Sequence, residues 1–222
     1  MRIRVFASAL CFLVIVPALL GSGASTMPSS SPSSMSSMSP QEMAIRSFND
    51  GLRYRDRAWK QEKQLATLQD AAQREKLAEA IRKSYEADIR AQREAIQHNP
   101  SMYQAHTELG YALRKTGHYD DALKSYDEAL LLMPNYGEAV EYRAEAYLGL
   151  NRVDDAKKSY LMLYNGGAKD LAKQLGDAMQ KWVADRKANP AGADAASVDD
   201  FAKWLGQRSE IAGTTGTGSS WK

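Results

Sequence analysis

The sequence has few of the residues from which covalent cross-links, metal sites and reactive centres are built. Its 222 residues include one cysteine, Cys11, and three histidines. Cys11 lies in the apolar segment at the start of the chain, so the remainder offers neither disulfides nor thiolate ligands. His98, His106 and His118 lack H-x-x-x-H spacing, and no glycine-rich phosphate loop or nucleophile elbow occurs. We therefore expect no metal, no other cofactor and no enzyme activity.

An excess of one charge sign is also lacking. The chain holds 29 basic and 27 acidic residues, and residues 1–24 contain two of the basic residues, Arg2 and Arg4, and no acidic one. The remainder is therefore balanced in charge. Proteins that bind nucleic acids normally carry a strongly basic face. In residues 101–167 acidic residues outnumber basic ones, so we expect no nucleic-acid partner.

Long apolar runs are confined to the start of the chain. A basic start, an apolar stretch at 5–20 and small residues at 21–24 are typical of a secretory signal peptide. The stretch is shorter than the roughly 20 residues of a membrane-spanning helix. We expect cleavage after residue 24, no stable membrane span afterwards, and a periplasmic or extracellular protein; a retained anchor is the alternative. Cys11 follows Leu10 rather than a small residue, which disfavours lipidation.

Two segments have too little apolar surface to fold. Residues 25–40 are almost entirely Ser, Met and Pro, and residues 212–222 are rich in Gly, Thr and Ser. Burial in such segments does not offset the entropy lost on ordering. We predict a disordered linker at 25–40 and a flexible tail at 212–222.

The middle of the chain repeats at a spacing of 34 residues, the period of a helix-turn-helix repeat. Six matches carry this period: Pro100 with Pro134, Ala95 with Ala129, Ala112 with Ala146, Ala122 with Ala156, Tyr126 with Tyr160, and Asp120-Asp121 with Asp154-Asp155. Apolar and small residues also follow helical spacing within each unit. The pattern predicts paired helices that bury one shared apolar layer.

Each unit resembles the tetratricopeptide repeat. The unit at 103–136 has most of the pattern residues, namely Leu109-Gly110, Ala112, Gly117, Tyr119, Ala122, Tyr126, Ala129-Leu130 and Pro134. It departs at His106, where the family prefers Trp, and at Leu113, where it prefers Tyr. The unit at 137–170 keeps Ala146-Tyr147, Ala156 and Tyr160. The resemblance implies an all-α fold, an α-solenoid of antiparallel helix pairs, with two repeats in residues 101–167.

Two repeats need structured neighbours, because each unit buries its apolar face only against the next one. At 41–100 we expect a divergent, repeat-like hairpin of two long amphipathic helices, the first with Ile45, Phe48, Leu52 and Trp59 as its apolar face. At 168–211 we expect capping helices, the last of them capped by Ser197. Their apolar positions are Leu171, Leu175, Met179, Trp182, Val198, Phe201, Trp204 and Leu205.

The resemblance also implies where a partner binds. In the family, the first helix of each repeat lines a concave surface that takes an extended peptide or a helix. Carried over to this sequence, that surface comprises Gln104, Thr107, Tyr111, Arg114, Glu138, Glu141, Tyr142 and Glu145. The family's Lys and Asn clamp for a terminal carboxylate is absent. The glutamates predict a basic or polar partner segment, anchored by an aromatic or aliphatic residue against Tyr111 and Tyr142.

The sequence therefore predicts an exported protein-interaction module, an adaptor or a subunit of a cell-envelope assembly. The style of the signal and a mature chain without cysteine favour a bacterial source. A self-associating scaffold, and so a homo-oligomer, is the alternative, because apolar stripes on the terminal helices, including Trp182 and Trp204, can join copies of the chain. An enzyme is the least favoured class.

Overall fold

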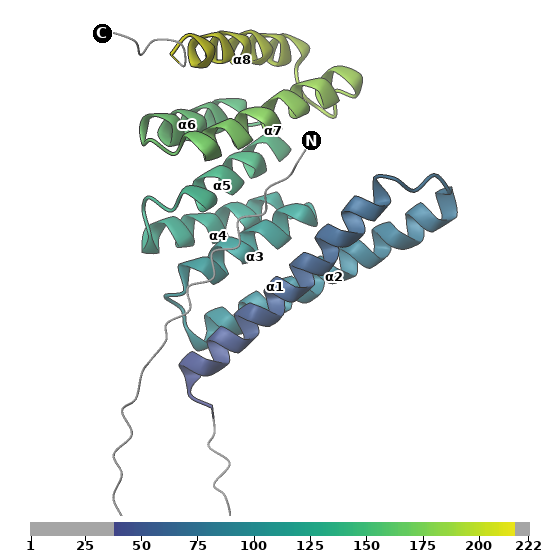
Figure 1. The fold of residues 1–222 in the computed structure, drawn as a ribbon, viewed down its shortest axis with the longest axis vertical. Coiled ribbons are helices and arrows are strands. Elements are labelled where there is room, and N and C mark those ends of the chain that lie inside the picture. The colour runs from purple at the N-terminus through teal and green to yellow at the C-terminus, as the bar shows by residue number, and fades with distance from the viewer. Residues whose placement is uncertain (1–37, 216–222) are drawn as a thin grey trace, which may run out of the picture. The chain divides into compact units, whose positions relative to one another are not determined.

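A computed structural model describes residues 38–215, with side chains as far as residue 208 (Figure 1). The predicted signal peptide, residues 25–37 of the linker and residues 216–222 of the tail lie outside the described residues. Within 38–215 every regular element is an α-helix. In chain order the helices are α1 (Pro40–Leu65), α2 (Ala71–His98), α3 (Tyr103–Lys115), α4 (Tyr119–Leu132), α5 (Gly137–Gly149), α6 (Val153–Asn165), α7 (Lys169–Ala188) and α8 (Ala195–Thr215).

These helices pack as consecutive antiparallel pairs, α1 with α2, α3 with α4, α5 with α6 and α7 with α8. This confirms the predicted all-α architecture. The first helix begins with a capping box, in which Ser39 Oγ accepts from the Glu42 amide and the Glu42 carboxylate accepts from the Ser39 amide. No helix in residues 38–215 is long and apolar enough to cross a bilayer.

The long hairpin of α1 and α2 closes through small residues. The buried residues of α1 are Ala44, Ser47, Gly51 and Ala58. A Cβ on Gly51 would lie 2.1 Å from Nε2 of Gln92 in α2. The side chains of Gln92 and Asp88 therefore fill the space beside Gly51 at this point of the seam.

The apolar face predicted for α1 is wrong in part. Ile45 is 44% exposed, while Phe48, Leu52 and Trp59 are half-buried. On the α1 side the buried positions are occupied by small residues, and this stripe lies beside them. Trp59 packs against Tyr111 of α3 instead.

Three turns share one backbone geometry: those inside the α3–α4 and α5–α6 pairs and the one between α6 and α7. Gly117, Asn151 and Gly167 have φ of 84°, 57° and 83°, in the left-handed region. The next amide donates to a carbonyl oxygen five residues earlier, at 2.9, 2.8 and 2.9 Å. Gly117 and Asn151 are one period apart, and Asn is among the few non-glycine residues that adopt this conformation readily.

The junctions before α3 and α5 also resemble each other. The Met102 amide donates to the Asn99 carbonyl before α3, and the Tyr136 amide donates to the Met133 carbonyl before α5, each at 3.1 Å. The two bonds are one period apart. The junction between α2 and α3 therefore has the same hydrogen bond as the junction between α4 and α5. This is expected if α2 is the second helix of a preceding, divergent unit.

Small residues lie where the helices of a pair meet. In α3 and α4 a group of alanines has no exposed surface: Ala105, Ala112, Ala122 and Ala129. Gly110 faces the ring of Tyr126, which is itself fully buried. Small residues allow close helix approach, and the aromatic rings fill the layer between the helices.

The capping pair α7 and α8 completes the apolar layer. Trp182 of α7 and Phe201 of α8 meet edge to face at 5.7 Å between ring centroids. Leu175, Met179 and Leu205 are buried in the same cluster. The predicted cap of α8 is wrong by three residues, because the Asp194 carboxylate, and not Ser197, accepts from the exposed amide of the first turn.

Candidate functional site

The first helices of successive pairs contact one another in the order α1, α3, α5, α7. We call the side of the stack that they form the odd-helix face. All eight residues predicted to bind a partner lie on α3 or α5. They therefore come from adjacent helices of this face.

Four of the predicted residues form a contact ladder between the two repeats. The rings of Tyr111 and Tyr142 are 5.0 Å apart between centroids. The Arg114 guanidinium lies 5.0 Å from the Tyr111 ring centroid and 5.7 Å from that of Tyr142. Its Nη1 pairs with Glu145 Oε2 at 2.5 Å. The ladder (Tyr111, Arg114, Tyr142 and Glu145) joins α3 to α5, and its Tyr111 is buried at 8% exposure.

The other four predicted residues divide between the interior and the surface. Thr107 is 2% exposed and its hydroxyl donates to the Tyr103 carbonyl at 2.9 Å. Glu141 is 4% exposed. Gln104 is half-buried and Glu138 is exposed. Only Gln104 and Glu138 of this group therefore present much surface to a partner.

The negative charge predicted for α5 is largely internal. Burial, reinforced by the neighbouring Glu145 carboxylate, raises the pKa of Glu141. A raised pKa favours the neutral acid. The charge of Glu145 is paired with Arg114. Of the three glutamates, Glu138 alone is exposed, so the argument for a basic partner loses most of its support.

Helix α1 adds residues that the sequence did not predict for this face. Trp59 Nε1 donates to the Tyr111 hydroxyl at 2.7 Å. Arg55 pairs with Glu108 at 2.5 Å, and its guanidinium lies 4.3 Å from the Trp59 ring centroid. Burial raises the pKa of Glu108 in spite of Arg55. The i,i+4 spacing of Arg55 and Trp59 indicates that both side chains lie on one face of α1. It does not identify their partners, which lie more than 50 positions away in the sequence.

A second contact ties the long hairpin to the end of α3. The Tyr85 hydroxyl donates to Glu62 at 3.0 Å, and Lys115 pairs with the same carboxylate at 2.7 Å. The Lys115 ammonium also lies 5.6 Å from the Tyr85 ring centroid. These contacts help fix the hairpin on the first repeat.

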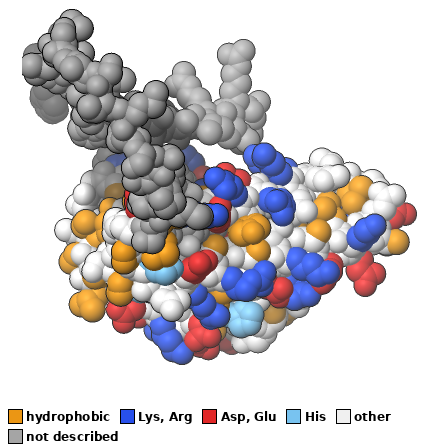
Figure 2. Space-filling view, turned by 90° about the horizontal axis from the view of Figure 1, so that it is seen from below, with side chains coloured by type: hydrophobic (Ala, Val, Ile, Leu, Met, Phe, Trp, Pro, Cys, Tyr) orange, Lys and Arg blue, Asp and Glu red, His pale blue; other side chains and the backbone are white. Residues whose placement is uncertain are grey.

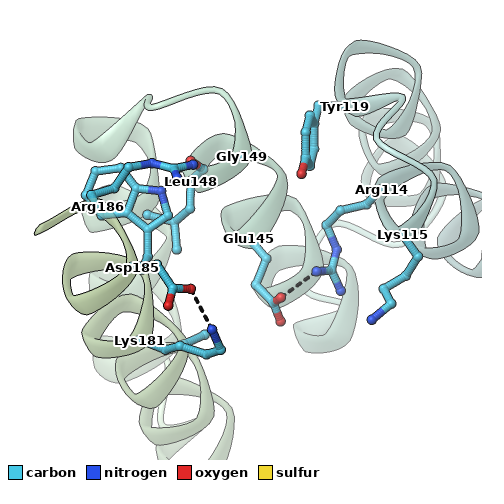
Figure 3. A pocket seen from close by; sticks show the side chains of 11 residues that line it. Arg114, Lys115, Tyr119, Glu145, Leu148, Gly149, Lys181, Asp185 and Arg186 are labelled. Carbon is cyan, nitrogen blue, oxygen red and sulfur yellow. Dashed lines mark hydrogen bonds and ion pairs between the residues drawn. The ribbon is translucent and has the colours of Figure 1, made fainter. Parts of the chain in front are cut away.

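An open pocket adjoins the ladder. Side chains from the end of α3 and the start of α4 form one wall, the end of α5 forms the floor, and the second half of α7 forms the other wall (Figure 3). The pocket has a volume of about 340 Å³, at the lower end of the range for small-molecule sites. It extends the odd-helix face from α3 across α5 to α7.

Among the described residues, no group of three or more His, Cys, Asp and Glu is placed to hold a metal ion. His106 Nε2 lies 2.9 Å from the Pro100 carbonyl oxygen, a contact that ties α3 to the preceding junction. On the face in Figure 2, Lys and Arg side chains lie interspersed with Asp and Glu.

Comparison with known proteins identifies the first repeat. Residues 103–136 match the family model described as tetratricopeptide repeat. No curated protein sequence matches the chain. Among solved structures the chain is similar to the TPR2B domain–pHsp70 complex of yeast Sti1, with 13% identity, a TM-score of 0.39, and coverage of 75% of this chain and 98% of that one. The matched residues are those of α3, its turn and α4, so the chain carries a tetratricopeptide repeat at 103–136.

Proposed function

We propose that the chain is an exported protein-interaction module that binds a peptide or helix of a partner along the odd-helix face. It would act as an adaptor or as a subunit of a cell-envelope assembly. The observation that carries the proposal is the ladder, which is largely buried and holds α3 and α5 together beneath the accessible Gln104 and Glu138. Side chains that are already ordered lose less entropy on binding.

Tetratricopeptide repeats commonly serve as interaction scaffolds, and stacked repeats provide extended concave surfaces for partners. The contacts between α1 and α3, α3 and α5, and α5 and α7 make the odd-helix face continuous, which supports the proposal. The charged groups at its centre are engaged with one another, as in Arg114–Glu145 and Arg55–Glu108. This pairing favours a structural role for these side chains over a catalytic role.

Site-specific photocrosslinking tests the binding face. A photoreactive residue is placed at Gln104 or Glu138 on the odd-helix face, and at Lys124 or Lys158 as matched controls. The two lysines are one period apart on α4 and α6, and their side chains are 77% and 76% exposed. We expect crosslinks to one partner from positions 104 and 138 only. Crosslinks from 124 and 158 alone would refute the proposed face.

Export rests on the basic start, the apolar stretch at 5–20 and the small residues at 21–24. N-terminal sequencing of the protein recovered from its native cells tests it. We expect the mature chain to begin at Ser25. A protein that retains Met1 and stays in the cytoplasm would contradict export without affecting the binding face.

Self-association is the alternative, favoured by one surface feature. Leu131, Leu132 and Met133 at the end of α4 are consecutive and 76%, 39% and 41% exposed. Contiguous exposed apolar residues often mark contact surfaces. Light scattering of the mature chain and of Leu131→Glu separates the cases. A monomer in both samples supports the adaptor, whereas an oligomer that the substitution dissociates supports the scaffold.

A further inference from the structure

The pocket between α3, α5 and α7 combines an excess of cations with a small apolar floor. Four basic residues line it, Arg114, Lys115, Lys181 and Arg186, against two carboxylates, Glu145 and Asp185. In Figure 3 the Arg114–Glu145 pair joins α3 to α5, whereas the Lys181–Asp185 pair lies on α7.

The two remaining cations differ in how they are paired. Lys115 pairs with Glu62, which lies outside the pocket. Arg186 Nε donates to the side-chain carbonyl of Asn151 at 3.1 Å, a neutral acceptor that leaves the guanidinium charge in place. The guanidinium also lies 5.4 Å from the Trp182 ring centroid, which orients it. A guanidinium presents a fork of further N–H donors to a planar anion.

The apolar part of the pocket is rigid. Trp182 Nε1 donates to the Leu148 carbonyl at 2.7 Å, which locks the indole against the end of α5. Gly149 continues the floor, and a Cβ there would lie 2.3 Å from Cε1 of Tyr119, so the Tyr119 ring rests directly on the backbone. An anion in this pocket therefore has a fixed apolar surface beside it.

We propose that this pocket receives an aspartate or glutamate side chain of the partner segment, held by Arg186 and by Lys181, which also pairs with Asp185. An adjacent aliphatic or aromatic residue of that segment packs against the half-buried ring of Tyr119. The inference rests on the proposed function. It reverses the expectation of a basic partner, because the negative charge of α5 is buried or paired, whereas Arg186 lines the pocket with only a neutral hydrogen-bond acceptor. Opposite charges across an interface guide encounter and select partners.

The test uses a phage-displayed library of random dodecapeptides selected on the full chain, followed by fluorescence-polarisation titration of the enriched peptides. We expect enrichment of Asp or Glu next to an aliphatic or aromatic residue. Arg186→Gln and Lys181→Glu should each weaken binding by roughly tenfold, the scale of a lost charge-assisted hydrogen bond. Circular dichroism checks that each variant remains folded.

Lys173→Glu is the matched control. Lys173 lies on the same helix, pairs with Asp177 four residues on, as Lys181 does with Asp185, and has the same 74% side-chain exposure, but does not line the pocket. The affinity of the Lys173→Glu variant for the enriched peptides should stay within about twofold of the wild-type value. Enrichment of Lys and Arg would overturn the acidic-ligand inference, and equal losses in the Lys173 and Lys181 variants would overturn the pocket. A selection that enriches no peptide would also refute the acidic-ligand inference. The proposed function is tested separately, by photocrosslinking at positions 104 and 138.

Discussion

The ring of Tyr126 in α4 covers Gly110 in α3 so closely that a Cβ on residue 110 would lie 2.5 Å from Tyr126 Cε1. Tyr126 has no exposed surface, so its ring has little room to move. The two residues therefore set the distance between the helices of the first repeat.

Gly110→Ala should destabilise the fold by about 1–3 kcal/mol, because the added methyl overpacks this contact. Gly206→Ala in α8 is the control, since a Cβ there meets no neighbouring atom. Alanine should stabilise that exposed helical position by about 0.5–1 kcal/mol. Urea denaturation measures both effects. Equal changes at the two positions would contradict the close α3–α4 contact.

The left-handed turns make a second prediction. Asn151 occupies the position of Gly117 one period later, so Gly117→Asn should be tolerated. Gly117→Val should cost roughly 1–3 kcal/mol, because a β-branched residue is strained at this φ. A Cβ on residue 117 meets no atom within 4 Å. The difference in stability between Gly117→Asn and Gly117→Val should therefore reflect backbone strain and not a steric clash at Cβ. Thermal denaturation of both variants is the measurement, and equal melting temperatures would refute the equivalence.

The period of 34 residues was enough to predict the repeat fold, because the same small and aromatic residues recur at the positions where paired helices touch. The orientation of α1 was not predictable in this way. An amphipathic stripe such as Ile45, Phe48 and Leu52 shows that a helix has an apolar side, but not how closely its partner approaches. The small residues Ala44, Ser47 and Gly51 determined the α1–α2 seam instead.

The candidate site was predictable in position but not in chemistry. The family pattern placed Tyr111, Arg114, Tyr142 and Glu145 on neighbouring helices, and the structure brings them into contact. The burial of Glu141 depends on packing between helices, which residue type does not reveal. The pocket also depends on α7, whose residues match no part of the family model.

The buried Asp88 makes stability depend on pH. Asp88 has no exposed surface, accepts from Gln92 at 2.9 Å, and burial raises its pKa to about 7. The unfolded value is about 3.9, so the unfolded chain loses this proton first as pH rises. The group's contribution to stability is complete below about pH 4 and is lost progressively up to about pH 7, by at most about 4 kcal/mol.

Asp88→Asn should remove that dependence, because the amide stays neutral and keeps an oxygen for Gln92. Urea midpoints at pH 5 and pH 8 should differ less in Asp88→Asn than in the wild type, with the variant the more stable at pH 8. Asp177→Asn, at an exposed position, serves as the control. Parallel pH profiles for wild type and Asp88→Asn would show that Asp88 is ionised in the folded state.

The Arg55–Glu108 pair tests the junction between the hairpin and the first repeat. The side chains are 17% and 14% exposed, and Arg55 Nε and Glu108 Oε2 are buried without hydrogen-bond partners. Removing Arg55 leaves Glu108 buried without a charge partner, so Arg55→Met should cost roughly 3 kcal/mol. Glu108→Leu should cost less, because Arg55 also pairs with Asp56 at 3.3 Å. The double variant should recover much of the loss. Additive losses in a double-mutant cycle would show that the pair is not coupled.

Amide hydrogen exchange of the mature chain, alone and with its captured partner, is the most direct test of partner binding along the odd-helix face. If the partner lies along the odd-helix face, new protection will concentrate in α3, α5 and the second half of α7, while α4 and α6 remain unchanged. Protection confined to α4 and α6, or spread evenly over the helices, would contradict binding at the ladder and the pocket.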